Sequence, residues 1–245
     1  MSEAAGVPAT RRPSAKAQRL RLRFAREPEA AGVGHLDLAR VWARAFDEAG
    51  LVLSYSEGAR QQPRLTFAAG LPAVATSEGE LVDAVLAEVA APSSAAERLR
   101  SHLPPGLTPL DAWEVGLGLP SLPSVVRWAE YRLDLPAGVS EAEAAAAVAA
   151  FLTLERLDWE EPRGEKVRRY DIRPLAQHIA VERGCEGAAR LAMRLRCDSA
   201  GVGRPEQVVS ALGLPQAARI HRTRLILAEV SPARDAWRRR GRYLA

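Results

Sequence analysis

A chain of 245 residues, 47% of them hydrophobic and 26% charged, has the composition of a globular protein and is long enough for two domains. No segment approaches the roughly 18 uninterrupted apolar residues of a membrane helix, and the first residues lack an apolar core with a cleavage site. We therefore expect a cytoplasmic protein that does not bind membranes. The net charge of +4 lies mainly in residues 1–17 and 231–245, so a nucleic acid would bind a local basic patch or these tails rather than the whole surface.

Cys185 and Cys197 are the only cysteines in the sequence, and no His or second thiol lies at metal-ligand spacing from either. This excludes a zinc ribbon and an iron–sulfur cluster held wholly by this chain. We expect both cysteines to be inert small side chains, and we expect neither a metal nor a cofactor.

The first half alternates between strand-like and helix-like patterns. Residues 1–17 predict a disordered basic lead. Residues 19–24 place three Arg on one face and Leu, Leu and Phe on the other, which predicts a half-buried strand. The other expected elements are a helix at 36–49 ended by Gly50, strands at 51–55, 64–68 and 81–86, a helix at 93–103 and a strand at 107–115. Residues 81–86 fit a helix equally well by pattern, and we favour a strand beside 64–68. Glu78 and Glu80 are expected on a solvated loop.

The second half begins after a linker, which the prolines within residues 119–125 indicate. Ser140 is expected to cap a helix at 140–152, with Glu143 at the capping-box position. Pro205 opens a helix at 204–212. Strands are expected at 129–135, 156–161, 166–172, 189–197 and 218–228, with an irregular stretch at 174–187 and a basic aromatic tail at 231–245.

Both halves show the same order of elements, in which a strand, a helix and a strand are followed by an extra hairpin strand and then by a strand, a helix and a strand. A βαββαβ core of this kind is the ferredoxin-like motif. We therefore expect an α+β protein of two tandem ferredoxin-like domains with extra hairpin strands, at residues 18–118 and 126–230. The exposed sheet face of such a domain is a common platform for RNA.

Polar residues gather around the first predicted helix. His35 and Asp37 lie in its first turn, where free amides and the helix dipole favour an anion such as a phosphate. Tyr55 and Ser56 end the next strand, and Arg64 could face the same cleft as a clamp for phosphate or carboxylate. The structural alternative is a capping Asp37, a surface His35 and a turn with a partly buried Tyr55. A catalytic role for His35 and Asp37 is a further alternative.

Basic residues gather in the second half, near the predicted turn at 162–165 and on the last strand. They are Arg163, Lys166, Arg168, Arg169 and Arg173, followed by Arg222 and Arg224. Strands of one sheet would bring them together to contact an RNA backbone. The alternative is that they only protect sheet edges and keep the protein soluble. The tail combines Trp and Tyr with Arg, as single-strand binders do, and we assign it an auxiliary role.

Five short runs carry a resemblance to a known family. They are Gly-His-Leu-Asp-Leu at 34–38, Tyr-Ser-Glu-Gly at 55–58, Ser-Glu-Gly-Glu at 77–80, Lys-Val-Arg-Arg-Tyr-Asp at 166–171 and His-Arg-Thr-Arg at 221–224. With their order and spacing, the chain resembles the bacterial radical-SAM-linked protein family, a domain of unknown function fused to, or encoded beside, radical SAM enzymes. The resemblance implies a radical SAM enzyme as partner and a setting in RNA metabolism, and it implies no reaction.

These observations favour a non-catalytic accessory protein of a radical SAM enzyme that binds or positions RNA, either tRNA or rRNA. One alternative is an RNA-processing or RNA-modifying enzyme with a site at His35, Asp37 and Arg64. A second is a protein-interaction adaptor that binds no RNA. Sequence alone leaves open whether the chain is an enzyme.

Overall fold

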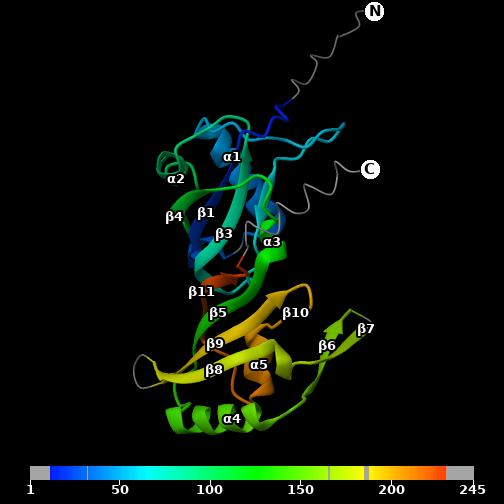
Figure 1. Cartoon of the computed structure of the whole chain (residues 1–245). Coiled ribbons are helices and arrows are strands. Elements are labelled where there is room, and N and C mark those ends of the chain that lie inside the picture. The colour runs from blue at the N-terminus through cyan, green and yellow to red at the C-terminus, as the bar shows by residue number, and fades with distance from the viewer. Residues whose placement is uncertain (1–11, 32, 165, 185–187, 230–245) are drawn as a thin grey trace, which may run out of the picture.

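The computed structural model describes residues 12–31, 33–164, 166–184 and 188–229 (Figure 1). The first-half elements are β1 (Gln18–Arg26), η1 (Pro28–Ala30), α1 (His35–Glu48), β2 (Leu65–Phe67), β3 (Thr76–Leu86), α2 (Pro92–Arg100), β4 (Leu107–Val115) and α3 (Leu122–Val125). The later elements are β5 (Val126–Asp134), α4 (Glu141–Thr153), β6 (Asp158–Arg163), β7 (Lys166–Asp171), η2 (Arg173–Leu175), β8 (Ala176–Arg183), β9 (Ala189–Asp198), β10 (Gly201–Val202), α5 (Pro205–Ala211) and β11 (Arg219–Leu227). The expected lead lies mostly outside the described residues, as do Cys185, the tail and the side chains of His35 and Arg163.

One mixed sheet runs through the described part of the chain, in the order β10-β9-β5-β11-β3-β1-β4, with β2 beside β3 and β8 beside β9. Its pairs are antiparallel apart from β11 and β3, which run parallel where His221 faces Thr76 and Arg222 faces Ser77. Figure 1 shows α1 and α2 at one end of the molecule and α4 and α5 at the other. The expected α+β class is confirmed, and the two halves share a sheet.

Each half has its own hydrophobic cluster between sheet and helices. In the first, Leu22 and Phe24 of β1 pack with Trp42 and Phe46 of α1, and the Phe24 and Trp42 ring centroids lie 5.0 Å apart. In the second, the alternate residues of β5 and β9 that include Leu133, Leu191 and Met193 are buried with Val148 of α4 and Val208 of α5. This alternation leaves the other side of β5 and β9 without helix cover.

Several local predictions hold for physical reasons visible in the backbone. Gly50 follows α1 with a φ of 63°, a conformation that ends a helix at little cost for glycine. The Ser140 hydroxyl accepts a hydrogen bond from the Glu143 amide at 3.1 Å, which is the expected cap of α4. The helix at 93–103 is present as α2, although Ala91 is its N-cap and no side chain caps it.

Four boundaries differ from expectation because long-range pairing decides them. Residues 51–55 form only the isolated bridges Leu53–Leu86 and Tyr55–Pro63. Residues 77–80 belong to β3, and the stretch expected to be irregular contains β8, which pairs with β9. The expected linker contains the single-turn helix α3. None of the described helices is long and apolar enough to cross a membrane.

Arg19 and Arg21 on the arginine face of β1 are buried while Arg23 is exposed, so the prediction of a half-buried strand is wrong at the first two of these positions. Arg19 and Arg21 are each 7% exposed, and Asp83 of β3 lies between them. Arg21 Nε donates to Asp83 Oδ1 at 2.7 Å, and Arg19 Nη1 donates to the Leu119 carbonyl at 3.1 Å. The segment between the halves thus covers this face, and a carboxylate on the neighbouring strand stabilises the buried charge.

Candidate nucleic-acid interface

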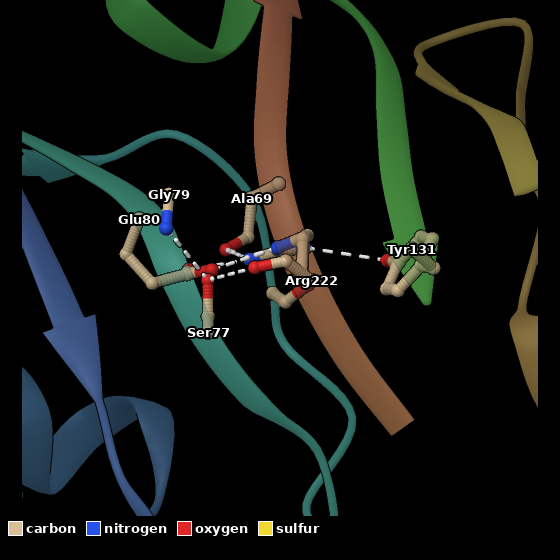
Figure 2. Close-up of polar contacts among 7 residues, drawn as sticks. Ala69, Ser77, Gly79, Glu80, Tyr131 and Arg222 are labelled. Atoms are coloured by element: carbon tan, nitrogen blue, oxygen red, sulfur yellow. Dashed lines mark hydrogen bonds and ion pairs between the residues drawn. The ribbon is translucent and has the colours of Figure 1, made fainter. Parts of the chain in front are cut away.

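A buried ion pair joins the two halves where β11 meets β3 (Figure 2). Arg222 of β11 is 0% exposed and Glu80 of β3 is 6% exposed. Arg222 Nε donates to Glu80 Oε1 at 2.7 Å, and a second bond joins Arg222 Nη2 to Glu80 Oε2. Arg222 Nη1 also donates to the Gly70 carbonyl at 2.9 Å and lies 3.5 Å from the Tyr131 hydroxyl. Burial lowers the pKa of Arg222, but Glu80 and Tyr131 together more than offset this effect and the pKa is raised.

The seam, by which we mean the contact of residues 76–80 with residues 221–224, requires a glycine. A Cβ on Gly79 would lie 2.4 Å from the Arg224 Cα and 2.5 Å from the Thr223 carbonyl oxygen. The Ser77 hydroxyl donates to the Arg222 carbonyl at 2.9 Å and accepts from the Gly79 amide at 3.1 Å. Two of the runs that carry the family resemblance therefore meet here and hold the halves together.

These contacts correct two expectations about charged residues. Arg222 was predicted to contact an anion at the surface, which is wrong because the side chain is fully buried and paired. Glu80 was expected on a solvated loop, and it instead lies buried in β3. Glu78 is more exposed, and its Oε1 lies 3.8 Å from His221 Nε2, while His221 Nδ1 lies 2.8 Å from the Thr76 hydroxyl.

The predicted first-half cleft is only partly assembled. Arg64 Nε donates to the Tyr55 carbonyl at 3.3 Å, and the Ser56 hydroxyl accepts from the Gln62 amide at 2.9 Å, so Tyr55, Ser56 and Arg64 share one turn. The Arg12 guanidinium binds the Tyr55 hydroxyl and lies 4.8 Å from the ring centroid. A hollow of about 690 Å³ borders Tyr55 and the side of α1 from Ala39 to Asp47.

Asp37 lies elsewhere, in the first turn of α1. It accepts a hydrogen bond from Arg40 Nη1 at 3.2 Å with 63% of its side chain exposed, and among the described residues it has no hydrogen bond to a helix amide. The helix begins at His35 as expected, with Gly34 as its N-cap. Asp37 does not border the hollow that Tyr55 lines, although its partner Arg40 does.

Four of the five basic residues predicted to cluster at 163–173 belong to the separate β6-β7 ribbon, away from β11 in Figure 1. Arg169 Nε donates to Glu160 Oε1 at 2.7 Å, and Arg168 lies 5.0 Å from the Tyr170 ring centroid. Glu160 of β6 thus offsets the positive charge of Arg169. Because the ribbon is not part of the main sheet, the expectation that these residues join those of β11 on one sheet is wrong.

Arg173 has a structural position at the end of α4. Its Nε donates to the Leu154 carbonyl at 3.1 Å and its Nη2 to the Leu152 carbonyl at 3.3 Å. The guanidinium also lies 5.4 Å from the Phe151 ring centroid. A cation bonded to the free carbonyls of a helix C-terminus stabilises that helix, so Arg173 is committed to the fold.

Among the described residues, a large group of partly exposed basic side chains lies on the side of the second-half sheet that has no helix cover. We call it the open face, and it comprises Trp128, Glu130, Arg132 and Asp134 of β5, Arg190, Arg194 and Arg196 of β9, and Arg219, His221 and Arg224 of β11. The register sets these residues side by side, with Trp128 opposite Arg196, Glu130 opposite Arg194 and Asp134 opposite Arg190. On the other flank Arg219 lies opposite Asp134 and Arg224 opposite Glu130. Arginines thus outnumber carboxylates across three adjacent strands.

Ion pairs order part of the open face. Arg194 Nη2 donates to Glu130 Oε1 at 2.6 Å and Arg224 binds the same carboxylate, so the pKa of Glu130 is lowered, mainly by its hydrogen bond to Arg224. Arg190 Nε donates to Asp134 Oδ1 at 2.6 Å. Arg132 and Arg219 are exposed, and neither has an ion-pair partner among the described residues. These two guanidiniums are free to bind an anionic ligand.

Comparison with known proteins gives a family. A model described as an uncharacterized protein conserved in bacteria (DUF2344) matches residues 19–205, which is more than half of the chain. The chain belongs to this family. No curated protein matches it.

Among solved structures, a chain of the structure titled "Crystal Structure of a Cbf5-Nop10-Gar1 Complex" matches this DUF2344 chain with a TM-score of 0.46 and 11% identity. The match covers 84% of the DUF2344 chain and 48% of the other, so it spans about half of that protein. At this similarity we transfer no property from it.

The sequence of the DUF2344 chain carries one signal for the open face. Residues 189–198 alternate between buried and partly buried side chains, and the buried Leu191, Met193 and Leu195 are each followed by Ala192, Arg194 and Arg196 in turn. The pattern predicted this strand but not which strands lie beside it in the sheet, because β5 and β11 come from distant parts of the chain. Cys197 on the buried side is 8% exposed, and burial raises the pKa of its thiol.

Proposed function

We propose that this DUF2344 protein is a non-catalytic accessory protein of a radical SAM enzyme, and that it binds single-stranded segments of tRNA or rRNA on its open face. The observation that carries the proposal is a helix-free sheet surface with Trp128 and arginines on three adjacent strands. Clustered guanidiniums contact phosphates, and an aromatic ring on a sheet stacks on an unpaired base.

The chemistry of the open face suits a flexible polyanion. The free Arg132 and Arg219 lie on adjacent strands, with Arg132 opposite His221 and Arg219 opposite Asp134. They would supply the salt-dependent contacts to phosphates. Trp128, opposite Arg196 and Ile226, would supply a stacking surface. The paired Arg194 and Arg224 would add positive potential while Glu130 fixes their geometry.

The fold and the resemblance support two further parts of the proposal. A βαββαβ unit has the strand order seen in each half. In the second half this order is β11-β5-β9-β8, and in the first half it is β4-β1-β3 with the Leu53 bridge beside β3. We therefore propose two tandem ferredoxin-like units joined at the seam. The radical SAM partner rests on the resemblance of runs such as residues 34–38 and 166–171. Co-purification of the untagged enzyme with the tagged full chain, with and without ribonuclease, tests this partner.

Fluorescence anisotropy with labelled single-stranded RNA and with tRNA, over 50–300 mM salt, tests the RNA site. The double variant Arg132→Ala/Arg219→Ala removes two phosphate contacts, so the slope of log K against log salt should shrink by about 1.4. Trp128→Ala should weaken single-stranded RNA binding by about 1–3 kcal/mol.

The matched control is Arg44→Ala/Arg100→Ala, which removes two exposed charges from α1 and α2 and should leave both values unchanged. RNA binding that is absent from the wild type, or equal in the open-face variants and the control, would refute the RNA proposal. Enzyme capture that survives ribonuclease treatment, together with absent RNA binding, would favour the adaptor alternative.

A further inference from the structure

A second concave site lies in the first half, between the start of α1 and the loop that precedes β3. Its volume is about 320 Å³, and its walls include Phe24, Leu38, Phe67 and Leu71. Gly34 and Gly70 also line it. A largely apolar cavity of this size lies at the lower end of the range for small-molecule sites.

Two buried charged residues, Arg26 and Glu80, also line this cavity. Arg26 is 6% exposed, and its Nε and Nη2 donate to the Ala30, Ala31 and Val33 carbonyls at distances from 2.8 to 3.2 Å. Its Nη1 has no hydrogen-bond partner among the described residues, and it is not one of the nitrogens sealed from solvent. Because Arg26 lines the cavity, this nitrogen is the donor that the cavity offers.

The charge around Arg26 is not balanced by the protein. Glu80 is already bonded to Arg222 through both carboxylate oxygens, so two buried guanidiniums share one carboxylate. The pKa of Arg26 is lowered, first by burial, while Glu80 raises it and Arg222 lowers it further. A guanidinium remains protonated in spite of such a shift, so an added anion would be stabilising here.

We propose that this cavity binds a small molecule with a planar apolar body and a single oxyanion group, such as an aromatic carboxylate. The planar body would lie against Phe24 and Phe67, and the oxyanion would accept a hydrogen bond from Arg26 Nη1. The site is separate from the open face, since the two share no residue.

Two dyes of matched shape test the proposal on the full chain. One is 8-anilinonaphthalene-1-sulfonate, which carries an anion, and the other is the uncharged N-phenyl-1-naphthylamine. The wild type should bind the sulfonate at least about tenfold more tightly. Gly70→Phe should weaken sulfonate binding by about tenfold or more, because a Cβ at Gly70 meets nothing within 4 Å and the ring can enter the cavity. Ala73→Trp, at an exposed lining residue, is a second occluding variant.

Gly116→Phe is the matched control, since its Cβ would meet only Leu119, at ordinary contact distances, and it does not line the cavity. It should leave sulfonate affinity within about twofold of the wild type. Equal affinity for the two dyes, or sulfonate binding that is unchanged in both occluding variants, would overturn the proposal. RNA binding should be unchanged in Gly70→Phe, which separates the two sites.

Discussion

The buried pair of Arg222 and Glu80 allows a quantitative prediction. Glu80→Gln keeps the size of the side chain but removes its charge, which leaves a guanidinium at 0% exposure without a counter-ion. The remaining acceptors of Arg222, chiefly the Gly70 carbonyl at 2.9 Å, are neutral. Removing one partner of a buried ion pair costs about 3–5 kcal/mol. At about 2–4 °C per kcal/mol for a chain of this length, Tm should fall by about 6–20 °C.

Urea unfolding followed by circular dichroism measures this loss, and the matched control is Glu97→Gln. Glu97 pairs with Arg100 at 2.7 Å but is 72% exposed, so its substitution should cost less than about 1 kcal/mol. The double variant Glu80→Leu/Arg222→Met removes both charges and should be closer in stability to the wild type than Glu80→Gln is. A loss below about 1 kcal/mol in Glu80→Gln would show that the seam does not depend on this pair.

Three other substitutions test separate parts of the fold. Gly79→Ala forces backbone at the seam apart and should cost about 1–3 kcal/mol in urea unfolding, whereas no loss would contradict the close approach. The folded pKa of Glu130 lies below its ordinary value of 4.5, so its stabilisation is present above that pH and is lost as pH falls through the folded pKa. Tm should therefore fall more in the wild type than in Glu130→Gln between pH 7 and about pH 3, and parallel curves would refute this. Ser140→Ala removes the α4 cap and should cost about 1 kcal/mol, with Ser124→Ala as a control outside that helix.

Local signals in the sequence were sufficient for most elements of the fold. The alternation at 189–197, the stop at Gly50 and the cap at Ser140 depend on residues close in sequence, and each element was predicted. The prediction of a loop at residues 77–80 was wrong. Ser, Glu and Gly favour loops, but β1 and β11 on either side supply hydrogen bonds for a strand. Long-range pairing therefore overrode local propensity at the seam.

The charges were harder to predict than the elements. Sequence shows that Arg19 and Arg21 alternate with leucines, but their burial depends on Asp83 and on the cover of residues 119–120. Arg222 and Arg224 are two positions apart, and one is fully buried while the other has a side chain that is 62% exposed. A register shift in β11 between these residues separates their environments. A count of arginines in a segment cannot reveal this difference.

β3 links the two proposed binding sites through the residues of the seam. Glu78 lies near His221 of the open face, and Glu80, two residues later, lines the cavity and neutralises Arg222. A register shift between β1 and β3 in this region gives these carboxylates different environments. Because Glu80 belongs to both the cavity and the seam, an anion bound at Arg26 changes the electrostatic environment of the contact between the halves. Coupling of this kind is reciprocal, so a substitution that weakens the seam should also change affinity for the sulfonate dye.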